Sequence, residues 1–315
     1  MLQVLIYSFF VFVFGLCIGS FLNVVILRAF SGESIVLPPS KCPNCKEKIK
    51  WYDNIPLLSY LILKGQCRNC KTKISIQYPI VEFATGLIWF LIFFKFGLSV
   101  STLLLLILAS LGIVIATTDI KEKVVFDVHT ISFIVIAMIY RVLTNATVEG
   151  IFGLIAGALI MEILARLGYL FVKRRAFGEG DTYIAAGIGA LFGVKLFIII
   201  LVLSIVLQVV CILPNFLSNI WKEGEKSFVV SFLIFIVSTF SYKLLLFKHL
   251  LSKYSEYAFV AVIVASGIFS CVKLLKAVKK KNEFNYLPFG PSMLFVSLMM
   301  VLWSNYIIQI VQKMV

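Results

Sequence analysis

Residues 100–118 read VSTLLLLILASLGIVIATT, a run without a charged side chain that ends at Asp119. Its length matches the ~18 to 20 apolar residues that span a bilayer as one helix. A second acid occupies the same kind of place, because Asp181 closes the string Gly178-Glu179-Gly180-Asp181 and a nearly uncharged apolar run follows it. Acidic residues at the edges of membrane segments are energetically expensive and indicate function. The two aspartates therefore predict a carboxylate pair in a membrane protein.

The whole chain has the composition of a polytopic membrane protein. Of its 315 residues, 61% are hydrophobic and 14% are charged, whereas a soluble domain is roughly half apolar. The net charge is +14, and the basic residues fall between apolar runs, as in cytoplasmic loops, so we expect no nucleic-acid partner. The first apolar run starts at Met1 and ends in a basic loop. We expect an uncleaved membrane anchor with its N-terminus outside.

The distribution of charge predicts a topology. Residues 28–78 carry nine basic and three acidic residues, which places this loop in the cytoplasm. Counting helices from it returns the chain to the cytoplasm at Asp119 and again at residues 178–181. The stretch 182–213 is too long for one span, and we expect a break at Gly193-Val194-Lys195. The other expected helices cover residues 79–94, 100–118, 128–143, 151–172, 228–247, 257–274 and 291–310, so that the chain has about ten transmembrane helices in all.

Four cysteines in the cytoplasmic loop have the spacing of a zinc site. Each of two C-x2-C strings presents two sulfurs from one tight turn, and the gap between them fits a four-thiolate site. A loop with so few apolar residues would gain much of its folding energy from the metal. Four thiolates leave no open position, so we expect a structural zinc. Disulfides are the alternative, which a cytoplasmic location disfavours. The predicted ligands are Cys42, Cys45, Cys67 and Cys70.

The carboxylate pair predicts a reaction. Two carboxylates held close together share a proton, because both cannot ionise cheaply. One can then act as general base on a water while the other, protonated, polarises a carbonyl, which hydrolyses a peptide without a covalent intermediate. Gly178 and Gly180 would let the backbone approach a substrate strand closely. Asp127 lies about two helical turns after Asp119 and is the rival partner, although we expect it to support or cap.

Several strings in this order resemble the type IV prepilin peptidase family, the membrane aspartic peptidases of the G-x-G-D kind. The resemblance covers most of the chain. The strings are GLCIGSFLNVVILR at 15–28, the two cysteine strings, WYDNIPLLSY at 51–60, YPIVE at 78–82, Asp119 with Ile120-Lys121, GEGD at 178–181 and PFGP at 288–291.

The resemblance implies a function for the pair. It implies membrane helices with the active site at the cytoplasmic face of the inner membrane, and Asp119 and Asp181 as the catalytic aspartates. It implies removal of the basic leader from prepilins or pseudopilins, in contact with pilus or secretion machinery. Many family members also methylate the new N-terminus with S-adenosylmethionine, for which the sequence shows no readable motif. Glu82 belongs to one of the matching strings, and at a helix start it would stabilise the helix dipole.

Two departures from the family pattern are visible. Family members usually carry a proline just before the position that matches Asp127, where this chain has Val124-Val125-Phe126. The region after residue 220 is longer than usual. The expected all-α polytopic fold comprises a transmembrane anchor (1–27), a zinc-binding cytoplasmic loop domain (28–78), a catalytic transmembrane domain (79–220), an extra helical pair (221–281) and a C-terminal transmembrane helix (282–315).

Two other classes of function are open at this point. A transporter or channel could relay protons or ions through paired acids, although transport acids usually lie near the middle of the membrane. A non-catalytic assembly factor of a secretion apparatus would have no need of the aspartate pair.

Overall fold

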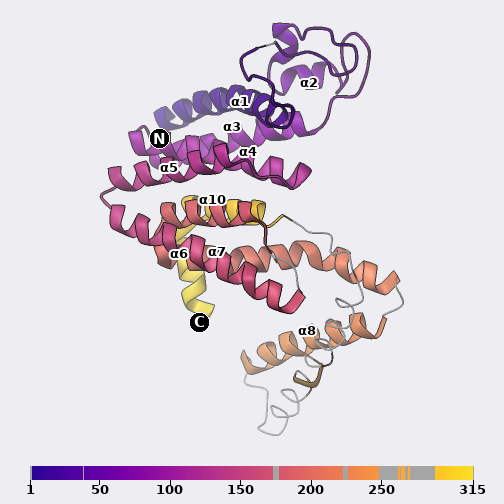
Figure 1. The fold of residues 1–315 in the computed structure, drawn as a ribbon, viewed down its shortest axis with the longest axis vertical. Helices are drawn as coiled ribbons and strands as arrows, with labels where there is room; N and C mark the ends of the chain where they lie inside the picture. Colours follow the sequence, from indigo (N-terminus) through magenta and orange to yellow (C-terminus); the bar gives the residue numbers. More distant parts are fainter. Residues whose placement is uncertain are drawn as a thin grey trace. The chain divides into compact units, whose positions relative to one another are not determined.

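Helices account for nearly all regular structure in the computed structural model of the chain (Figure 1). The structure describes residues 2–37, 39–172, 177–222, 226–247, 262, 264–266, 269 and 288–314. The chain divides into two compact units, one formed by Met1–Ile205 with Leu287–Val315 and the other by Val206–Tyr286. The first unit contains both aspartates and all four cysteines of the loop, so the candidate sites lie within it.

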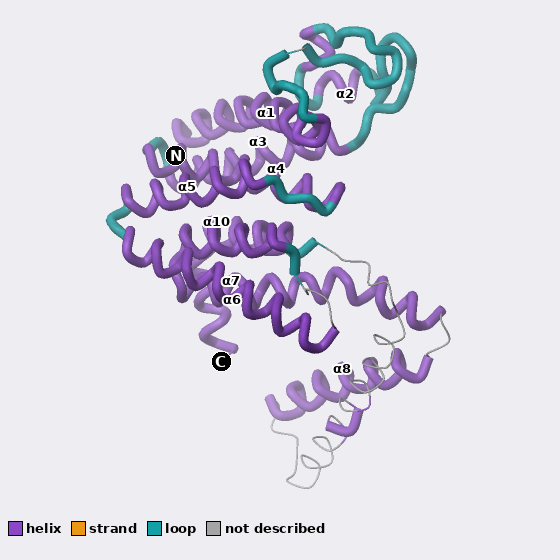
Figure 2. The backbone as a smooth tube through the Cα atoms, viewed as in Figure 1, coloured by secondary structure: helices purple, strands orange, loops and turns teal. Residues whose placement is uncertain are grey.

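The first unit is a set of long helices with one irregular loop domain (Figure 2). The loop domain lies between α1 and α3 in the sequence and contains only the 3-10 helix η1 (Trp51–Asn54) and the short helix α2 (Leu58–Ile62). The long helices are α1 (Leu2–Ser31), α3 (Gln77–Phe96), α4 (Val100–Glu122), α5 (Asp127–Leu143), α6 (Thr147–Val172), α7 (Glu179–Lys222) and α10 (Gly290–Met314). Helix α7 continues into the second unit, where the described residues also form α8 (Lys226–Phe247).

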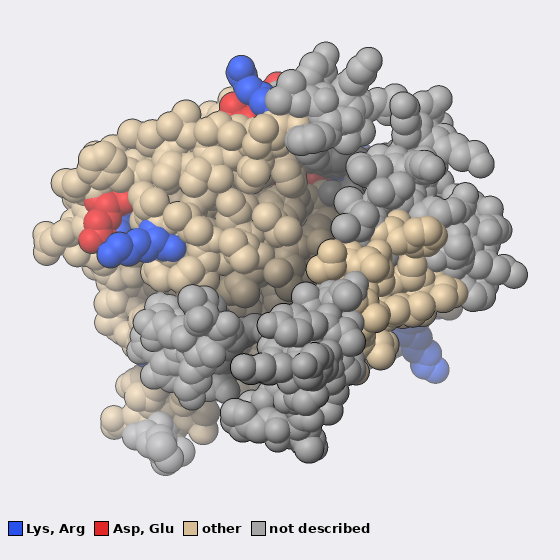
Figure 3. Space-filling view, turned by 90° about the horizontal axis from the view of Figure 1, so that it is seen from below, with Lys and Arg blue, Asp and Glu red and all other residues tan. Residues whose placement is uncertain are grey.

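Five helices of the described part are long and apolar enough to cross a membrane. They correspond to Gln3–Ser31, Gln77–Phe96, Val100–Glu122, Thr147–Leu167 and Glu179–Pro214, and two shorter apolar helices cover Val230–Thr239 and Gly290–Ser304. The described surface visible in Figure 3 is largely uncharged, as contact with lipid requires.

The expected count of about ten spans is not confirmed. Helix α5 has 17 residues, short of the ~20 that a typical span needs. The expected break of the stretch 182–213 is confirmed, because α7 consists of two helices that meet at a kink at Gly193, whose φ of 75° and ψ of 172° are not helical. The predicted helix at 257–274 lies largely outside the described residues.

Local sequence signals explain where the helices of the first unit begin and end. Ser99 caps α4, because its hydroxyl accepts a hydrogen bond from the Thr102 N–H at 3.0 Å. Lys123 ends α4 in the left-handed conformation, with φ 57°, and donates its N–H to the Asp119 carbonyl at 2.9 Å. This turn releases the chain from α4 just after Asp119.

Close helix contacts in the first unit depend on glycine. A Cβ on Gly19 of α1 would lie 2.6 Å from the Glu82 Cα of α3, and one on Gly153 of α6 would lie 2.0 Å from the Gly189 carbonyl oxygen of α7. Neither distance leaves space for a methyl group. Small residues at such crossings let membrane helices approach to backbone contact, which is the main source of their packing energy in lipid.

Candidate functional site

Two buried aspartates flank the start of α10. Asp119 lies near the C-terminal end of α4 and Asp181 in the first turn of α7, and their exposed fractions are 4% and 3%. A Cβ on Gly290, the first residue of α10, would lie 2.8 Å from Oδ2 of Asp119 and 3.5 Å from Oδ1 of Asp181. The structure therefore brings the two carboxylates that we predicted to pair next to the same glycine.

An aromatic contact packs the residues before Asp181 against the residues before Gly290. Phe177 precedes the GEGD string and Phe289 precedes Gly290, and their ring centroids lie 5.1 Å apart. Phe289 is 3% exposed. Aromatic pairs at this separation add to the packing energy, so this contact holds the start of α10 against the residues that introduce Asp181.

The two carboxylates differ in their hydrogen bonds. Oδ2 of Asp181 accepts the Gly178 N–H at 3.1 Å. Oδ2 of Asp119 is buried and has no hydrogen-bond partner in the described part of the chain. A buried oxygen without a partner is unfavourable for stability and calls for a functional explanation. Because it lies beside Gly290, where Oδ1 of Asp181 is also within reach, this oxygen is available to a reactant held at that place.

The two glycines of the GEGD string make contacts within the protein. We expected Gly178 and Gly180 to admit a substrate strand. In the structure Gly178 donates its N–H to Asp181, and a Cβ on Gly180 would lie 2.6 Å from the Cβ of Val125. Gly180 thus lets the start of α7 pack against the turn between α4 and α5, and this contact positions Asp181 next to α4.

Asp127 is not buried with Asp119 and Asp181. It is the first residue of α5, and it is exposed. The two-turn spacing from Asp119 assumed one continuous helix, whereas α4 ends at Glu122 and the chain turns at Lys123. The geometry therefore gives Asp127 the position of an N-terminal helix residue, where a carboxylate interacts favourably with the helix dipole.

Glu82 has a different role from the one its position in the sequence suggested. It lies in the second turn of α3, is 6% exposed, and its Oε2 accepts the N–H of Leu57 at 2.9 Å. The expected stabilisation of the helix start is thus wrong in detail, because the carboxylate bonds to the loop domain rather than to the first turn of α3.

The four loop cysteines form one cluster that could hold a metal ion. Their sulfurs all lie within 4.8 Å of one another, with Cys42 and Cys70 3.8 Å apart and Cys45 and Cys67 4.0 Å apart. Sulfurs around a tetrahedral zinc at ~2.3 Å would be about 3.8 Å apart. These separations are too long for a disulfide at ~2.05 Å, and all four thiols are free. The donor set fits a single four-coordinate metal.

The two halves of the cluster have the same backbone geometry. In each, the first cysteine donates its N–H to the residue five positions later and accepts the N–H of the residue four positions later, a lysine with φ 60°. The halves are also joined, because Asn44 donates to the Thr72 hydroxyl at 2.8 Å, which lies 3.3 Å from Sγ of Cys70. This hydrogen bonding lowers the pKa of the Cys70 thiol to about 5, whereas burial and the neighbouring sulfurs raise the pKa of the Cys45 thiol to about 11.

Gly290 is the member of the site that sequence reasoning did not place. The PFGP string at 288–291 contributed to the family resemblance without a position in space. A glycine just ahead of an apolar run was the available signal, and its contact with both aspartates depends on how α10 packs against α4.

Two family models match the chain, and each includes one of the candidate sites. The model of the bacterial Peptidase A24 N-terminal domain matches residues 13–96, which include the four cysteines, and that of the Type IV leader peptidase family matches residues 106–213, which include both aspartates. No solved structure matches the chain.

Three relatives share the name prepilin leader peptidase/N-methyltransferase. The chain is 38% identical to the Myxococcus xanthus protein over 61% of its own length and 60% of that protein. It is 33% identical to the Neisseria gonorrhoeae protein, over 58% of its own length and 73% of that protein. The Klebsiella pneumoniae protein is 35% identical over 58% of this chain and 84% of that protein.

Proposed function

Because the chain belongs to the type IV leader peptidase family, we propose that it is an aspartic endopeptidase that removes the basic leader of type IV prepilins or pseudopilins. The observation that carries this proposal is that the buried carboxylates of Asp119 and Asp181 both lie next to Gly290. Family membership does not favour the alternative of a transporter or channel.

The pair would act by general acid–base catalysis. One carboxylate removes a proton from a water, whose oxygen attacks the scissile carbonyl carbon, while the other, protonated, donates a hydrogen bond to the carbonyl oxygen. The tetrahedral intermediate then collapses, the carbon–nitrogen bond breaks, and a proton passes to the leaving amine. The Gly178 N–H would orient Asp181 for this reaction, and Oδ2 of Asp119, which has no hydrogen-bond partner in the described part of the chain, would be free to bind the reactant.

The proposal places the reaction at the cytoplasmic face of the inner membrane. The support is the basic loop at residues 28–78, which precedes α3 and carries nine basic against three acidic residues. The substrate would be a precursor that spans the same membrane, with its leader on the side of the aspartates. Pilus or secretion machinery would receive the product.

Zinc is the metal that we propose for the cysteine cluster. Cys42, Cys45, Cys67 and Cys70 would hold it, and when bound it would supply cross-linking of a loop that has little apolar core. Its four protein ligands leave no position for a substrate, so its role would be structural.

Methylation is a second activity that the relatives' name suggests. The relatives are named N-methyltransferases, and we propose that this chain also methylates the new N-terminal amine with S-adenosylmethionine. We assign no residue of the chain to that cofactor. Transfer of a labelled methyl group to cleaved prepilin is the measurement, and cleaved product that stays unmethylated in the presence of S-adenosylmethionine would contradict the activity.

Cleavage of a prepilin-type substrate by the purified protein tests the main proposal. Asp119→Asn and Asp181→Asn should each abolish cleavage, because each removes one proton carrier. Asp127→Asn is the matched control and should retain activity, since that side chain is exposed at the start of α5. Full activity in either of the first two variants would refute the assignment of Asp119 and Asp181 as the catalytic pair.

A further inference from the structure

One segment of the loop domain, residues 51–62, exposes many large apolar side chains. The exposed fraction is 80% for Trp51, 56% for Leu58, 69% for Leu61 and 73% for Ile62. The last three lie at helical spacing on α2 and therefore share one face of it. A surface of this kind facing water is unusual and marks a site of contact with a partner or membrane.

A hydrogen bond fixes this segment at the level of the membrane surface. Leu57, the residue before α2, donates its N–H to Glu82 of α3 at 2.9 Å. Glu82 lies five residues after the start of α3, about 7 Å along the helix axis. Because α3 is a candidate membrane span, α2 begins beside the second turn of a membrane helix. Because helical side chains lean toward the N-terminus of their helix, the Glu82 carboxylate holds Leu57 nearer the helix start, close to the boundary between hydrocarbon and headgroups.

The backbone conformation of Leu57 shows that its surroundings hold this residue in place. Leu57 has φ 59° and ψ −49°, a conformation that a non-glycine residue adopts only when its surroundings hold it there. Its hydrogen-bond partner is a buried carboxylate of α3. Glu82 therefore joins the loop segment to α3 at the point where Gly19 of α1 packs against the α3 backbone.

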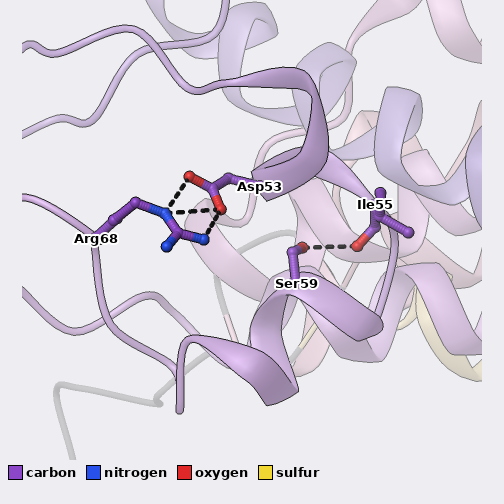
Figure 4. A network of polar contacts seen from close by, with 4 residues as sticks. All are labelled: Asp53, Ile55, Ser59 and Arg68. Atoms are coloured by element: carbon purple, nitrogen blue, oxygen red, sulfur yellow. Dashed lines mark hydrogen bonds and ion pairs between the residues drawn. The ribbon is translucent and has the colours of Figure 1, made fainter.

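The charges around the segment match an anionic membrane surface. Lys50 and Lys64 flank it on the two sides. Its single acid, Asp53, forms an ion pair with Arg68 at 2.6 Å, with two donor nitrogens on the carboxylate (Figure 4), so the acid is neutralised within the protein. An apolar face bordered by lysines, with an exposed tryptophan in the same segment, is typical of segments that lie in the membrane interface.

We propose that residues 51–62 form an interfacial anchor that lies in the anionic headgroup layer of the leaflet on the aspartate side. Glu82 is the positioning residue that holds this anchor at its depth. The anchor and the cysteine cluster belong to the same loop domain, so lipid contact would fix the orientation of that domain to the membrane. The occupant is lipid rather than substrate, because the apolar face is level with α3 and the basic residues complement phosphate.

Depth-dependent quenching in proteoliposomes tests the proposal, measured first without prepilin and then after a prepilin is added. A fluorescent non-canonical amino acid replaces Leu61, which leaves the cysteines intact, and the bilayer is phosphatidylethanolamine with phosphatidylglycerol. A nitroxide on the lipid near the headgroup should quench the probe at least about twofold more strongly than aqueous iodide does. The reverse order would overturn the proposal, and so would quenching protection that appears only after a prepilin is added.

Two substitutions test the role of Glu82. Glu82→Gln keeps an oxygen that can accept the Leu57 N–H, so the probe should stay at the same depth. Glu82→Ala removes the acceptor, and we expect iodide to quench the probe about twofold or more strongly than in the parent protein. The zinc content of both variants shows whether the cysteine cluster is still folded. Equal depth in Glu82→Ala and the parent protein, with zinc retained, would refute the positioning role.

Discussion

Substitution of Gly290 by alanine tests whether the narrow space between the aspartates matters for cleavage. The new Cβ would lie 2.8 Å from Oδ2 of Asp119 and 2.7 Å from Cδ1 of Ile184. The isoleucine methyl can rotate away. The carboxylate would have to retreat by roughly 0.6 Å to reach ordinary contact, and it would leave the position that faces Asp181.

The expected effect follows from this displacement. A misplacement of about 1 Å in a reacting group can lower the rate ~10²-fold, so we expect Gly290→Ala to lower kcat by about 10- to 100-fold, or ~1.4 to 2.7 kcal/mol of barrier. Stability should not fall to the same degree, because alanine favours a helix by up to ~1 kcal/mol over glycine. Initial rates of prepilin cleavage, measured with the thermal unfolding midpoint of the same samples, separate the two effects.

Gly112→Ala provides the matched control. Gly112 lies on α4, as Asp119 does, and a Cβ there would meet only Leu294 of α10 at an ordinary 3.6 Å. We expect activity within about twofold of the parent protein, since no backbone or carboxylate must move. Unchanged activity in Gly290→Ala, or an equal loss in both variants, would refute the reasoning from the site geometry.

Three further predictions concern the framework around the site. Cys67→Ser should lower bound zinc to less than about half an ion per chain by elemental analysis and make the loop sensitive to protease; full zinc occupancy would contradict a four-cysteine site. Gly153→Ala should destabilise by at least ~2 kcal/mol in unfolding measurements, because its Cβ would lie 2.0 Å from the Gly189 carbonyl oxygen; a stability equal to that of Gly112→Ala would contradict the close crossing. Lys95→Met should cost about 1 to 3 kcal/mol, since Lys95 donates to the Val301 and Leu302 carbonyls at 2.8 and 2.7 Å just before the bend in α10 at Trp303; an unchanged unfolding midpoint would show that these bonds add nothing.

The helices of the first unit were predictable because each depends on a continuous apolar run and on hydrogen bonds between near neighbours in the chain. The apolar run at 100–118 became α4 (Val100–Glu122), and the one at 151–172 became α6 (Thr147–Val172). Bilayer thickness sets the length of an apolar helix, and backbone hydrogen bonds are satisfied within it. The break at Gly193 was predictable too, because a glycine can adopt the positive φ of 75° that ends one helix and begins the next.

The cysteine cluster was also predictable, and the pairing of the aspartates only in part. Two cysteines separated by two residues meet in one turn whatever the rest of the chain does. Charge counting placed Asp119 and Asp181 on the same side of the membrane, but it left Asp127 as a rival. The left-handed turn at Lys123 separates Asp127 from α4, and side-chain patterns give little warning of such a turn.

The sequence by itself determined that this is a helical membrane protein with a four-cysteine loop and two acids at membrane edges. Hydrophobicity and ligand spacing act between near neighbours in the chain, so both can be seen in the printed residues. Only the tertiary structure decided that Asp119 and Asp181 both lie next to Gly290, and that Glu82 holds Leu57. These contacts join residues far apart in the chain, so they depend on how the helices pack, and glycines at the crossings let particular helices approach to backbone distance.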